Sequence, residues 1–423
     1  MRKTTVALAT ATLLLGFLTA CESKSGTDDG AAPAPAASGE PIVVGSTLSL
    51  SGAFAATGAI HKITGEAFVE RLNAGGGLLG RPVEWVVRDD ESDQAKVSTL
   101  YEQLISQDKV DLIMGPYATP NILSAMAVAA RHNYTMPQHT AVIAPLLTYE
   151  CQFPAWSIGP TPNEFVPNQL LDAVASLNPA PKKVAILTNQ NGSTDFVSYG
   201  AGNNKTGAVS ITKSRGLDLV LEVRYPPTTT DWAPIAAQVR DAAPDLVINS
   251  GLGVDPVNLL QAMAQLKYKP PLMFSLFPAP GPPLGLGPTS EGLMSVSIFE
   301  PNQPTLAKLP PVATEIVNDF KTRATAANLP YTVFETQAAA SWNAWEILTS
   351  GVKAANSVDN KAICDSLHSS GAETTFSGKL TFDPAQNNFW PTTSTIKQIQ
   401  GGDWVTVWPA DRAAAPLKAP TAG

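Results

Sequence analysis

The sequence predicts an α/β protein built from two lobes, and three observations lead to this fold class. Residues 41–160 alternate between short runs of β-forming residues and segments with apolar side chains at helical spacing. The same alternation returns after residue 180, which indicates a second set of strands and helices. A chain of 423 residues with 44% hydrophobic residues is long enough for more than one domain-sized core. We therefore expect mainly parallel sheets covered by helices on both faces.

The elements of the first set are short and sharply bounded. Strands are expected at 41–47, 83–87 and 110–114, because these runs are apolar and end at turn-forming residues. The helix that follows the first strand carries Ile60, Ile63, Ala67, Phe68 and Leu72 on one face and stops at a glycine-rich segment, 73–77. Further helices are expected at 93–106 and from residue 120.

The second set repeats this order with longer loops. Strands are expected at 183–188, 217–223, 246–250 and 272–276, and helices at 232–242 and 256–266. A final helical block covers 312–326 and 338–354, and it is followed by a hairpin at 378–382 and strands at 396–399 and 404–408.

The two ends of the chain do not read as core. Residues 1–20 form a secretory signal with Arg2 and Lys3 before an apolar run, and the Leu-Thr-Ala-Cys ending resembles a bacterial lipobox, which implies a lipid on Cys21. Residues 21–40 are expected to be a flexible tether and 410–423 a flexible tail, because both lack apolar bulk. The protein is thus expected outside the cytoplasm, attached to the cell membrane by lipid.

Two cysteines, Cys151 and Cys364, remain beyond the lipobox. An extracytoplasmic location permits a disulfide between them, and two buried thiols are the alternative. The overall charge is −8, with only 15% charged residues, so a nucleic-acid partner is not expected.

The first hundred residues after the tether resemble the leucine/isoleucine/valine-binding branch of the type I periplasmic binding proteins. The resemblance rests on Leu50-Ser51-Gly52, the 73–77 segment, Gly80-Arg81, Asp89-Asp90 and Gly115, with a further match around Trp342. It implies a Venus-flytrap of two α/β lobes joined by three crossover strands, with a solute held between lobes that close on it. The lobes would comprise 41–160 with 300–378, and 161–299 with 379–409.

Two loops are expected to bind an oxygen-bearing group of that solute. The segments 115–119 and 137–140 follow predicted strands, where open α/β sheets bind ligands, and the first leads into a helix whose free N–H groups favour an anion. By resemblance Thr119 and Thr140 would bind a carboxylate, although Thr119 also suits a plain helix cap. The same loops contribute the other expected contacts, Tyr117, Ala118, Gln138 and His139.

Further lining positions follow from the same resemblance. Thr57 stands where amino-acid binders often carry an aromatic ring, and Phe196 or Tyr199 would close on the solute from the second lobe together with Leu252 and Phe277. Residues 274–277 contain no carboxylate where the family places the partner of an ammonium group. Glu164 and Asp255 are the nearby acids, and for each of them the role of a surface acid or helix cap is favoured over that of an ammonium partner. We therefore expect a small carboxylate- or amide-bearing solute, with acids lacking an amine ahead of leucine-type amino acids.

No catalytic, metal or cofactor site is expected. The sequence has no Gly-x-Ser-x-Gly elbow, no His-Glu-x-x-His and no Cys-x-x-Cys, and its four histidines are scattered. The favoured function is that of a monomeric solute-binding lipoprotein serving an ABC permease and ATPase. A binding protein that presents its ligand to a membrane receptor and a secreted α/β enzyme are the alternatives.

Overall fold

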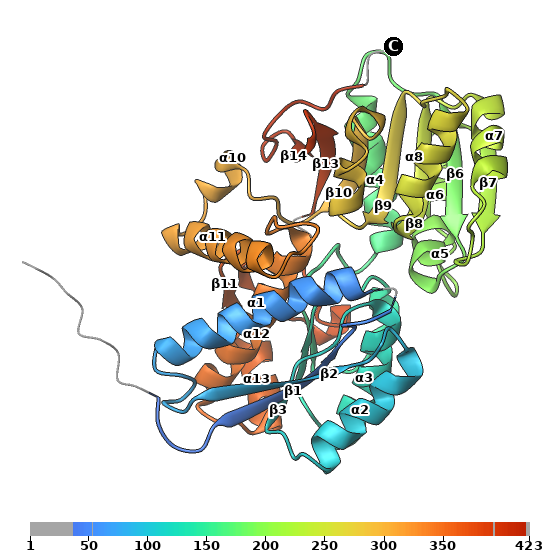
Figure 1. Ribbon diagram of the computed structural model, residues 1–423. Helices are drawn as coiled ribbons and strands as arrows, with labels where there is room; N and C mark the ends of the chain where they lie inside the picture. The colour runs from blue at the N-terminus through green and yellow to red at the C-terminus, as the bar shows by residue number, and fades with distance from the viewer. Residues whose placement is uncertain (1–36, 53, 392–393, 420–423) are drawn as a thin grey trace, which may run out of the picture. The chain divides into compact units, whose positions relative to one another are not determined.

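The computed structural model describes residues 37–52, 54–391 and 394–419. The predicted signal, Cys21 and most of the predicted tether, up to residue 36, lie outside these residues. The described part contains two main sheets with helices packed on them, so the α/β expectation is confirmed (Figure 1). No helix within the described residues is both long and apolar enough to pass through a bilayer.

The first sheet has three parallel strands in the order β2-β1-β3. Its strands are β1 (Ile42–Leu48), β2 (Val83–Asp89) and β3 (Leu112–Ile113). The helices that connect or cover them are α1 (Ala55–Ala74), α2 (Gln94–Ser106) and α3 (Thr119–His132), together with α11 (Pro311–Ala326), α12 (Thr336–Ala355) and α13 (Asn360–Ser370) from much later in the chain.

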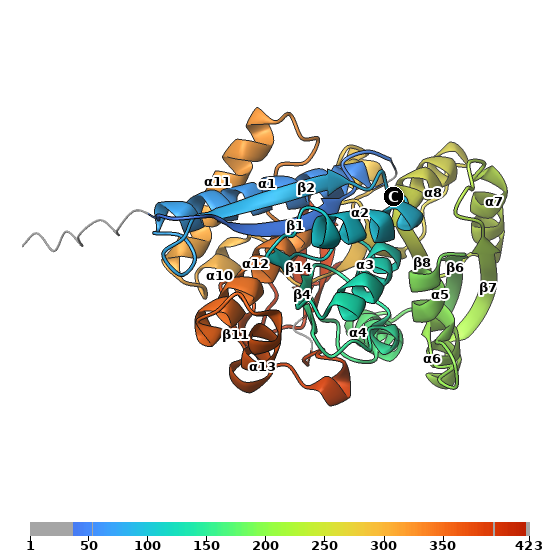
Figure 2. The same cartoon turned by 90° about the horizontal axis from the view of Figure 1, so that it is seen from below.

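Alternation of side chains explains why both faces of this sheet are covered. Ile42 and Val44 of β1 join the apolar cluster that holds α1, α11, α12 and α13, whereas Val43 packs on the opposite cluster with α2 and α3. Successive strand residues point to opposite faces, so one short strand supplies both clusters. Figure 2 shows α1 and α11 on one side of these strands and α3 on the other.

Two small strand pairs lie beside this sheet. The pair β4 (Met136–Gln138) and β5 (Gln152–Pro154) is parallel, and the pair β11 (Ala372–Thr374) and β12 (Gly378–Leu380) is antiparallel. The hairpin predicted near residues 378–382 is therefore present, with a first strand that the sequence reading missed.

The second sheet has seven strands in the order β14-β13-β10-β9-β8-β6-β7. Its parallel strands are β6 (Lys183–Asn189), β7 (Asp218–Tyr225), β8 (Leu246–Gly253), β9 (Leu272–Pro278) and β10 (Leu293–Ser297). β13 (Thr395–Gln400) pairs antiparallel both with β10 and with β14 (Asp403–Trp408). Its helices are α4 (Pro162–Ala175), α5 (Gly192–Tyr199), α6 (Ala208–Ser214), α7 (Ala233–Ala242) and α8 (Asp255–Gln265), with the short turns α9 (Gly281–Leu284) and α10 (Gln303–Leu306).

The chain passes between the two main sheets three times. These passages are 155–161 after β5, 298–302 after β10, and the segment from 381 that leads into β13 at 395. Strands and helices from both ends of the chain thus contribute to each sheet, although the lobe boundaries 41–160, 161–299, 300–378 and 379–409 stay predictions.

Residues 410–419 differ from the expected flexible tail. The N–H groups of Ala414 and Ala415 donate to the carbonyl of Thr406, and the Gln398 side chain of β13 donates to the carbonyl of Lys418. Leu417 packs against the apolar cluster of the second sheet. Composition misled the sequence reading here, because backbone hydrogen bonds and a single leucine are enough to attach a short segment to a sheet edge.

The structure pairs Cys151 with Cys364 in a disulfide, with Cα atoms 5.4 Å apart. Of the two readings of these cysteines, the bridge is the one that the structure contains. It joins the turn before β5 to α13, which are 213 residues apart in the sequence.

Candidate functional site

Strand order places one switch point in each main sheet. In the first sheet the chain moves from β1 to β2 on one side and then to β3 on the other side of β1. In the second sheet it moves from β6 to β7 and then to β8 on the far side of β6. Ligands of open α/β sheets bind beyond the carboxyl ends of the strands at such points. A ligand is therefore expected at the loops after β1 and β3 in the first sheet, or after β6 and β8 in the second.

The loop after β3 is shaped by a close approach of two backbones. Gly115 donates its N–H to the carbonyl of Pro137 at 2.8 Å, and a Cβ added at Gly115 would lie 2.9 Å from that same oxygen. Glycine is the residue that fits there. The loop ends at Ala118, whose φ of +73° turns the chain into α3.

Thr119 and Thr140 are brought together by this geometry. The Val142 N–H donates to the Thr119 Oγ1 at 2.9 Å, so Thr119 fixes the loop after β4. The hydroxyl of Thr140 is buried and has no hydrogen-bond partner among the described residues. A buried hydroxyl without a partner costs free energy, so a group that bonds to it would relieve that cost.

The side chain of Gln138 has a structural role. Its Oε1 accepts from the N–H of Ala141 at 3.1 Å, and its Nε2 donates to Gln152 at 3.4 Å. The amide closes the turn that carries His139 and Thr140 and is fully buried. The sequence expectation for Gln138 allows a backbone or a side-chain contact with the solute. The side-chain amide already forms these two hydrogen bonds, and the contact with a solute stays a prediction.

His139 stacks on a second histidine that the sequence reading set aside as scattered. Its ring lies 4.2 Å from that of His61 in α1. Its imidazole is hydrogen bonded to the backbone of Pro116, whereas its Nδ1 has no partner, which assigns the donated hydrogen to Nε2. Neither nitrogen of His61 meets hydrogen-bond geometry with a described residue, although the nearby Gln337 side chain acts to raise the pKa of His61.

Burial holds both histidines in the neutral form. It lowers the pKa of His139 to about 4, despite the opposing hydrogen bond to Pro116. Burial, followed by the neighbouring His139, lowers the pKa of His61 well below its usual value. The two imidazoles therefore contribute neutral donors and acceptors at the carboxyl ends of the first sheet.

Tyr117 forms the outer layer of this stack and is half-buried. Its ring lies 5.2 Å from His61 and meets the edge of Phe54 at 5.7 Å. Burial raises the pKa of Tyr117 to about 12, with the hydroxyl of Thr57 opposing the change. Phe54, three residues before Thr57, thus adds an aromatic ring beside Tyr117 that the sequence analysis did not consider.

In the second lobe, Phe196 does not lie where the sequence analysis expects it, on the wall that closes on the solute. Its ring is buried in the apolar cluster beneath the seven-stranded sheet, where it belongs with the core rather than with a cleft wall. Leu252 and Phe277 are register partners on β8 and β9 and are both half-buried. The Phe277 ring meets Trp156 edge-on at 5.8 Å, and Trp156 itself lies in the same buried apolar cluster as Phe196.

The two acids considered as ammonium partners already have partners in the chain. The Oδ2 of Asp255 accepts from Asn189, Tyr225 and the N–H of Leu252. The Oε1 of Glu164 accepts from Asn204 at 2.7 Å. Their interpretation as capping and surface acids accounts for these contacts.

A buried group of charged side chains lies where the passage 298–302 leaves β10. Lys397 of β13 donates from Nζ to the Oε1 of Glu300 at 2.6 Å, with exposed side-chain fractions of 5% and 2%. Glu335, at the start of α12, is buried beside them. We call these three residues the Glu300–Lys397–Glu335 cluster. The Nζ of Lys397 also lies 4.5 Å from the centre of the Trp404 ring.

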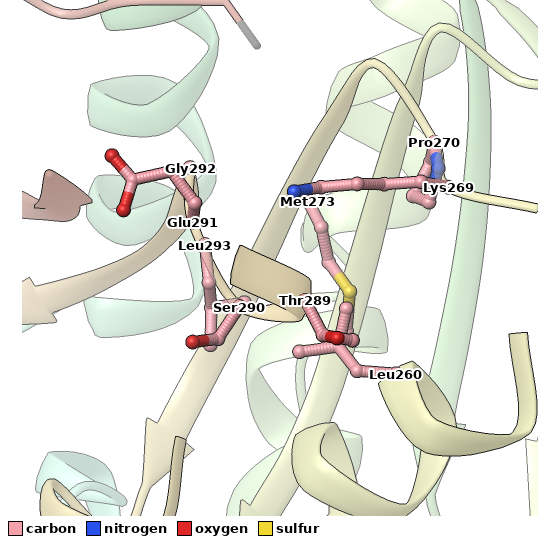
Figure 3. Close-up of a pocket in the computed structure, with 9 residues that line it drawn as sticks. All are labelled: Leu260, Lys269, Pro270, Met273, Thr289, Ser290, Glu291, Gly292 and Leu293. Carbon is pink, nitrogen blue, oxygen red and sulfur yellow. The ribbon is translucent and has the colours of Figure 1, made fainter. Parts of the chain in front are cut away.

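Two surface hollows lie elsewhere. Figure 3 shows one on the second sheet, where Lys269, Met273 and Glu291 are among the residues that surround it. Its volume of about 10 Å³ suits one water molecule at most. The other, of about 200 Å³, lies between α1 and α11 and is lined by Arg71, Arg323 and Trp342. Neither lies at a switch point.

Lowering the pH is expected to lower the unfolding free energy, because the buried His139 is neutral in the folded protein. Because the pKa of folded His139 lies below its unfolded value near 6.5, the unfolded chain binds more protons between pH 6.5 and 4, and stability is lost as pH falls through that window. From pH 7.5 to 5 we expect His139 to cost about 2 kcal/mol of unfolding free energy. Urea titrations of the wild type and His139→Gln, which keeps a donor near the Nε2 position, would measure the difference.

The comparison must be with the variant, because the raised pKa of Glu335 acts in the opposite direction between about pH 4.5 and 7. An identical slope in His139→Gln and the wild type would mean that His139 titrates normally.

Comparisons with known proteins agree with this architecture. Residues 41–403 match the family model described as periplasmic binding protein. Leu/Ile/Val-binding protein homolog 8 of Brucella abortus (strain 2308) is 26% identical over 238 residues, which are 54% of this chain and 56% of that protein. Leu/Ile/Val-binding protein homolog 7 of Brucella suis biovar 1 is 27% identical over 278 residues, 64% of this chain and 62% of that one. The matched part thus spans little more than half the length of these curated relatives.

Solved structures share the fold at low identity. A solute-binding protein of an ABC transporter from R. palustris, in complex with benzoate, gives a TM-score of 0.70 at 18% identity and covers 90% of this chain and 99% of that one. A leucine-binding protein from Thermotoga maritima gives 0.69 at 17% identity, with coverage of 86% and 97%. A Streptococcus pneumoniae branched-chain amino acid binding protein, in complex with isoleucine, gives 0.67 at 16% identity, with coverage of 87% and 100%.

Proposed function

This chain belongs to the periplasmic binding protein family, and from that premise we propose that it is the lipid-anchored solute receptor of an ABC importer of the branched-chain amino acid type. It holds a small carboxylate- or amide-bearing solute between two lobes that close on it, and it passes that solute to a membrane permease driven by an ATPase. The protein acts as a monomer and outside the cytoplasm.

The loops at the first switch point carry this proposal. Thr119 and the unpartnered hydroxyl of Thr140 lie at the start of α3 and in the adjoining loop, where backbone N–H groups are free to bind an oxygen. Tyr117 and Ala118 complete the first wall, and Leu252 and Phe277 offer apolar surface from the second sheet. This combination suits a small solute with one oxygen-bearing end and an apolar body.

The lipid anchor is the part of the proposal that depends on the sequence alone. Cys21 follows a signal-like run and precedes a segment without apolar bulk, which fits attachment through a lipid rather than a spanning helix. A Cys21→Ser protein that still stayed in the membrane fraction after signal cleavage would contradict the anchor.

A thermal-shift screen of the mature protein tests the binding function directly. A ligand that binds only the folded state raises the melting temperature by mass action. The screen should contain branched-chain and aromatic amino acids, aliphatic and aromatic carboxylates, amides and ureas. A set of shifts confined to one chemical class is expected, whereas turnover of an ester or amide in the same panel would favour an enzyme.

Removal of the Thr119 hydroxyl is expected to weaken binding about tenfold to a hundredfold. A hydrogen bond to a charged group contributes about 1.5–3 kcal/mol, and Thr119→Ala also releases the Val142 N–H that positions the adjoining loop. Titration calorimetry with the strongest hit of the screen measures the loss. Thr119→Ser keeps the hydroxyl and should bind within about threefold of the wild type; equal affinity in Thr119→Ala would remove Thr119 from the site.

A further inference from the structure

The segment 141–144, in the loop after β4, contributes side chains to two apolar cores. Ala141 and Ala144 are buried in the cluster that α2 and α3 form on the first sheet. Val142, between them, is 5% exposed and lies in the cluster of the second sheet, and Ile143 packs against that same cluster. Four consecutive residues therefore connect the two sheets by packing, in addition to the three passages of the backbone. We call Val142 and Ile143 the strap.

The strap meets the second sheet at the start of α5. The cluster that Val142 and Ile143 join contains residues of β6 and α5, Phe196 among them. A Cβ built on Gly192, the first residue of α5, would lie 3.7 Å from the Cδ1 of Ile143. Because α5 follows directly after β6, this contact lies at the switch point of the second sheet. The strap thus joins the loop after β4 to the loop after β6.

Backbone hydrogen bonds fix the strap to the first candidate site. The N–H of Val142 donates to the Oγ1 of Thr119 at 2.9 Å, and the N–H of Ala141 donates to the Oε1 of Gln138 at 3.1 Å. Thr140, whose buried hydroxyl has no partner among the described residues, precedes Val142 by two positions. A group that binds at these threonines therefore acts on the same short stretch of backbone that carries the strap.

The strap also lies beside the first passage between the sheets. Trp156 and Ile158 of that passage belong to the same apolar cluster as Val142. Separation of the lobes would move the half-buried Ile143 from this cluster into water, and the loss of apolar contact opposes that movement. The packing of one loop therefore favours the arrangement in which the two lobes are in contact.

We propose that the strap couples the binding of a solute at Thr119 and Thr140 to the contact between the two lobes. Val142 and Ile143 are positioning residues in this scheme, because they act through the loop that carries Thr140. The inference rests on the proposed solute-binding function and names the side chains that connect the first site to α5. By linkage, a change that strengthens the strap contact raises the affinity for the solute, and bound solute strengthens the contact by the same factor.

The first test places a charge in the strap. In Ile143→Asp the new carboxylate is hydrated when the lobes are apart and must lose water when they are in contact, so the variant favours separated lobes. Small-angle scattering of the mature protein without solute should give a larger radius of gyration than for the wild type. Calorimetry with L-isoleucine and with benzoate should show affinity lowered about tenfold or more, mainly through faster dissociation.

A second variant should act in the opposite direction. Gly192→Ala adds a methyl group at 3.7 Å from Ile143, an ordinary van der Waals distance, and Gly192 does not have a positive φ that would strain alanine. Affinity should rise about twofold. In an Ile143→Ala background the same substitution should bring no gain, because the methyl group then has no partner across the contact. This variant removes no apolar side chain, so it tests the strap even if Ile143→Asp fails to fold.

Leu146→Asp is the matched control for the introduced charge. Leu146 lies three residues after Ile143 in the same loop and is 50% exposed. Its replacement by aspartate should leave the radius of gyration and the affinities for both probes unchanged. An equal loss of affinity in Leu146→Asp and Ile143→Asp would show that charge near the site is responsible and would overturn the inference.

The remaining outcomes separate the strap from the function on which it rests. Equal radii and equal affinities in Ile143→Asp and the wild type would overturn the inference and leave the solute-binding function in place. A Gly192→Ala gain that persists in Ile143→Ala would do the same. If neither probe nor any other compound of the screen binds, the proposed function fails, and the scattering comparison without solute still decides whether the strap holds the lobes in contact.

Discussion

Replacing Lys397 with methionine is expected to lower the unfolding free energy by about 3–5 kcal/mol. The substitution leaves the buried carboxyl of Glu300 without its partner at 2.6 Å, in a region where water cannot take the place of the ammonium group. Methionine preserves most of the aliphatic stem, so the change isolates the charge rather than the packing. Urea denaturation at pH 8, followed by tryptophan fluorescence, measures the loss.

The contrast with an exposed pair makes this result interpretable. Lys361 pairs with Asp365 at 2.6 Å, but the two side chains are 80% and 62% exposed. Lys361→Met should therefore change stability by less than about 0.5 kcal/mol. If both substitutions cost the same, the buried pair contributes no more than a surface pair does.

Removing the disulfide is expected to cost about 2–5 kcal/mol. The bridge closes a loop of 213 residues, so it removes much of the freedom of the unfolded chain. Its loss should fall on the contact between the turn before β5 and α13. The Cys151→Ala, Cys364→Ala double variant, unfolded in urea beside the oxidised wild type, measures the difference.

Wild-type protein unfolded in the presence of a reducing agent provides the internal control, because it should match the double variant in both midpoint and slope. Hydrogen bonds from Asn388 to the carbonyls of Glu150 and Gln152 remain in both proteins and hold the same turn. An unchanged midpoint would show that those bonds suffice and that the bridge adds nothing at equilibrium.

The alternation of strands and helices could be predicted from the sequence because it follows from the local spacing of apolar side chains. Val184 and Ile186 of β6 enter one apolar cluster while Ala185 and Leu187 enter the other, and this two-residue pattern is visible in the chain itself. The loops around Thr119 and Thr140 could also be found, because they end strands whose positions the pattern had set.

The positions that were missed depend on contacts between distant segments. Phe196 lies on a helix with apolar residues on it, and nothing local says whether its ring enters the core or a cleft. His61 and His139 are 78 residues apart, one within α1 and the other in the loop after β4, and their rings meet only in the folded chain. Glu335 precedes a helix, where an acid normally indicates a cap, and its side chain does accept from the N–H of Gln337. The sequence does not show that it is also buried beside the Lys397–Glu300 pair, which forms only when β10 and β13 are in place.

The attachment of residues 410–419 has a practical consequence for anyone who wishes to turn this receptor into a fluorescent reporter. The carbonyls of Pro416 and Lys418 accept hydrogen bonds from the side chains of Gln400 and Gln398. This stretch is therefore attached to the outer strands of the second sheet. A reporter domain should be joined after Lys418, and trimming the chain back to Trp408 would uncover the Thr406 carbonyl on β14, the strand at the edge of the sheet. Such an edge invites association between molecules, which would confound the optical signal that the sensor is meant to report.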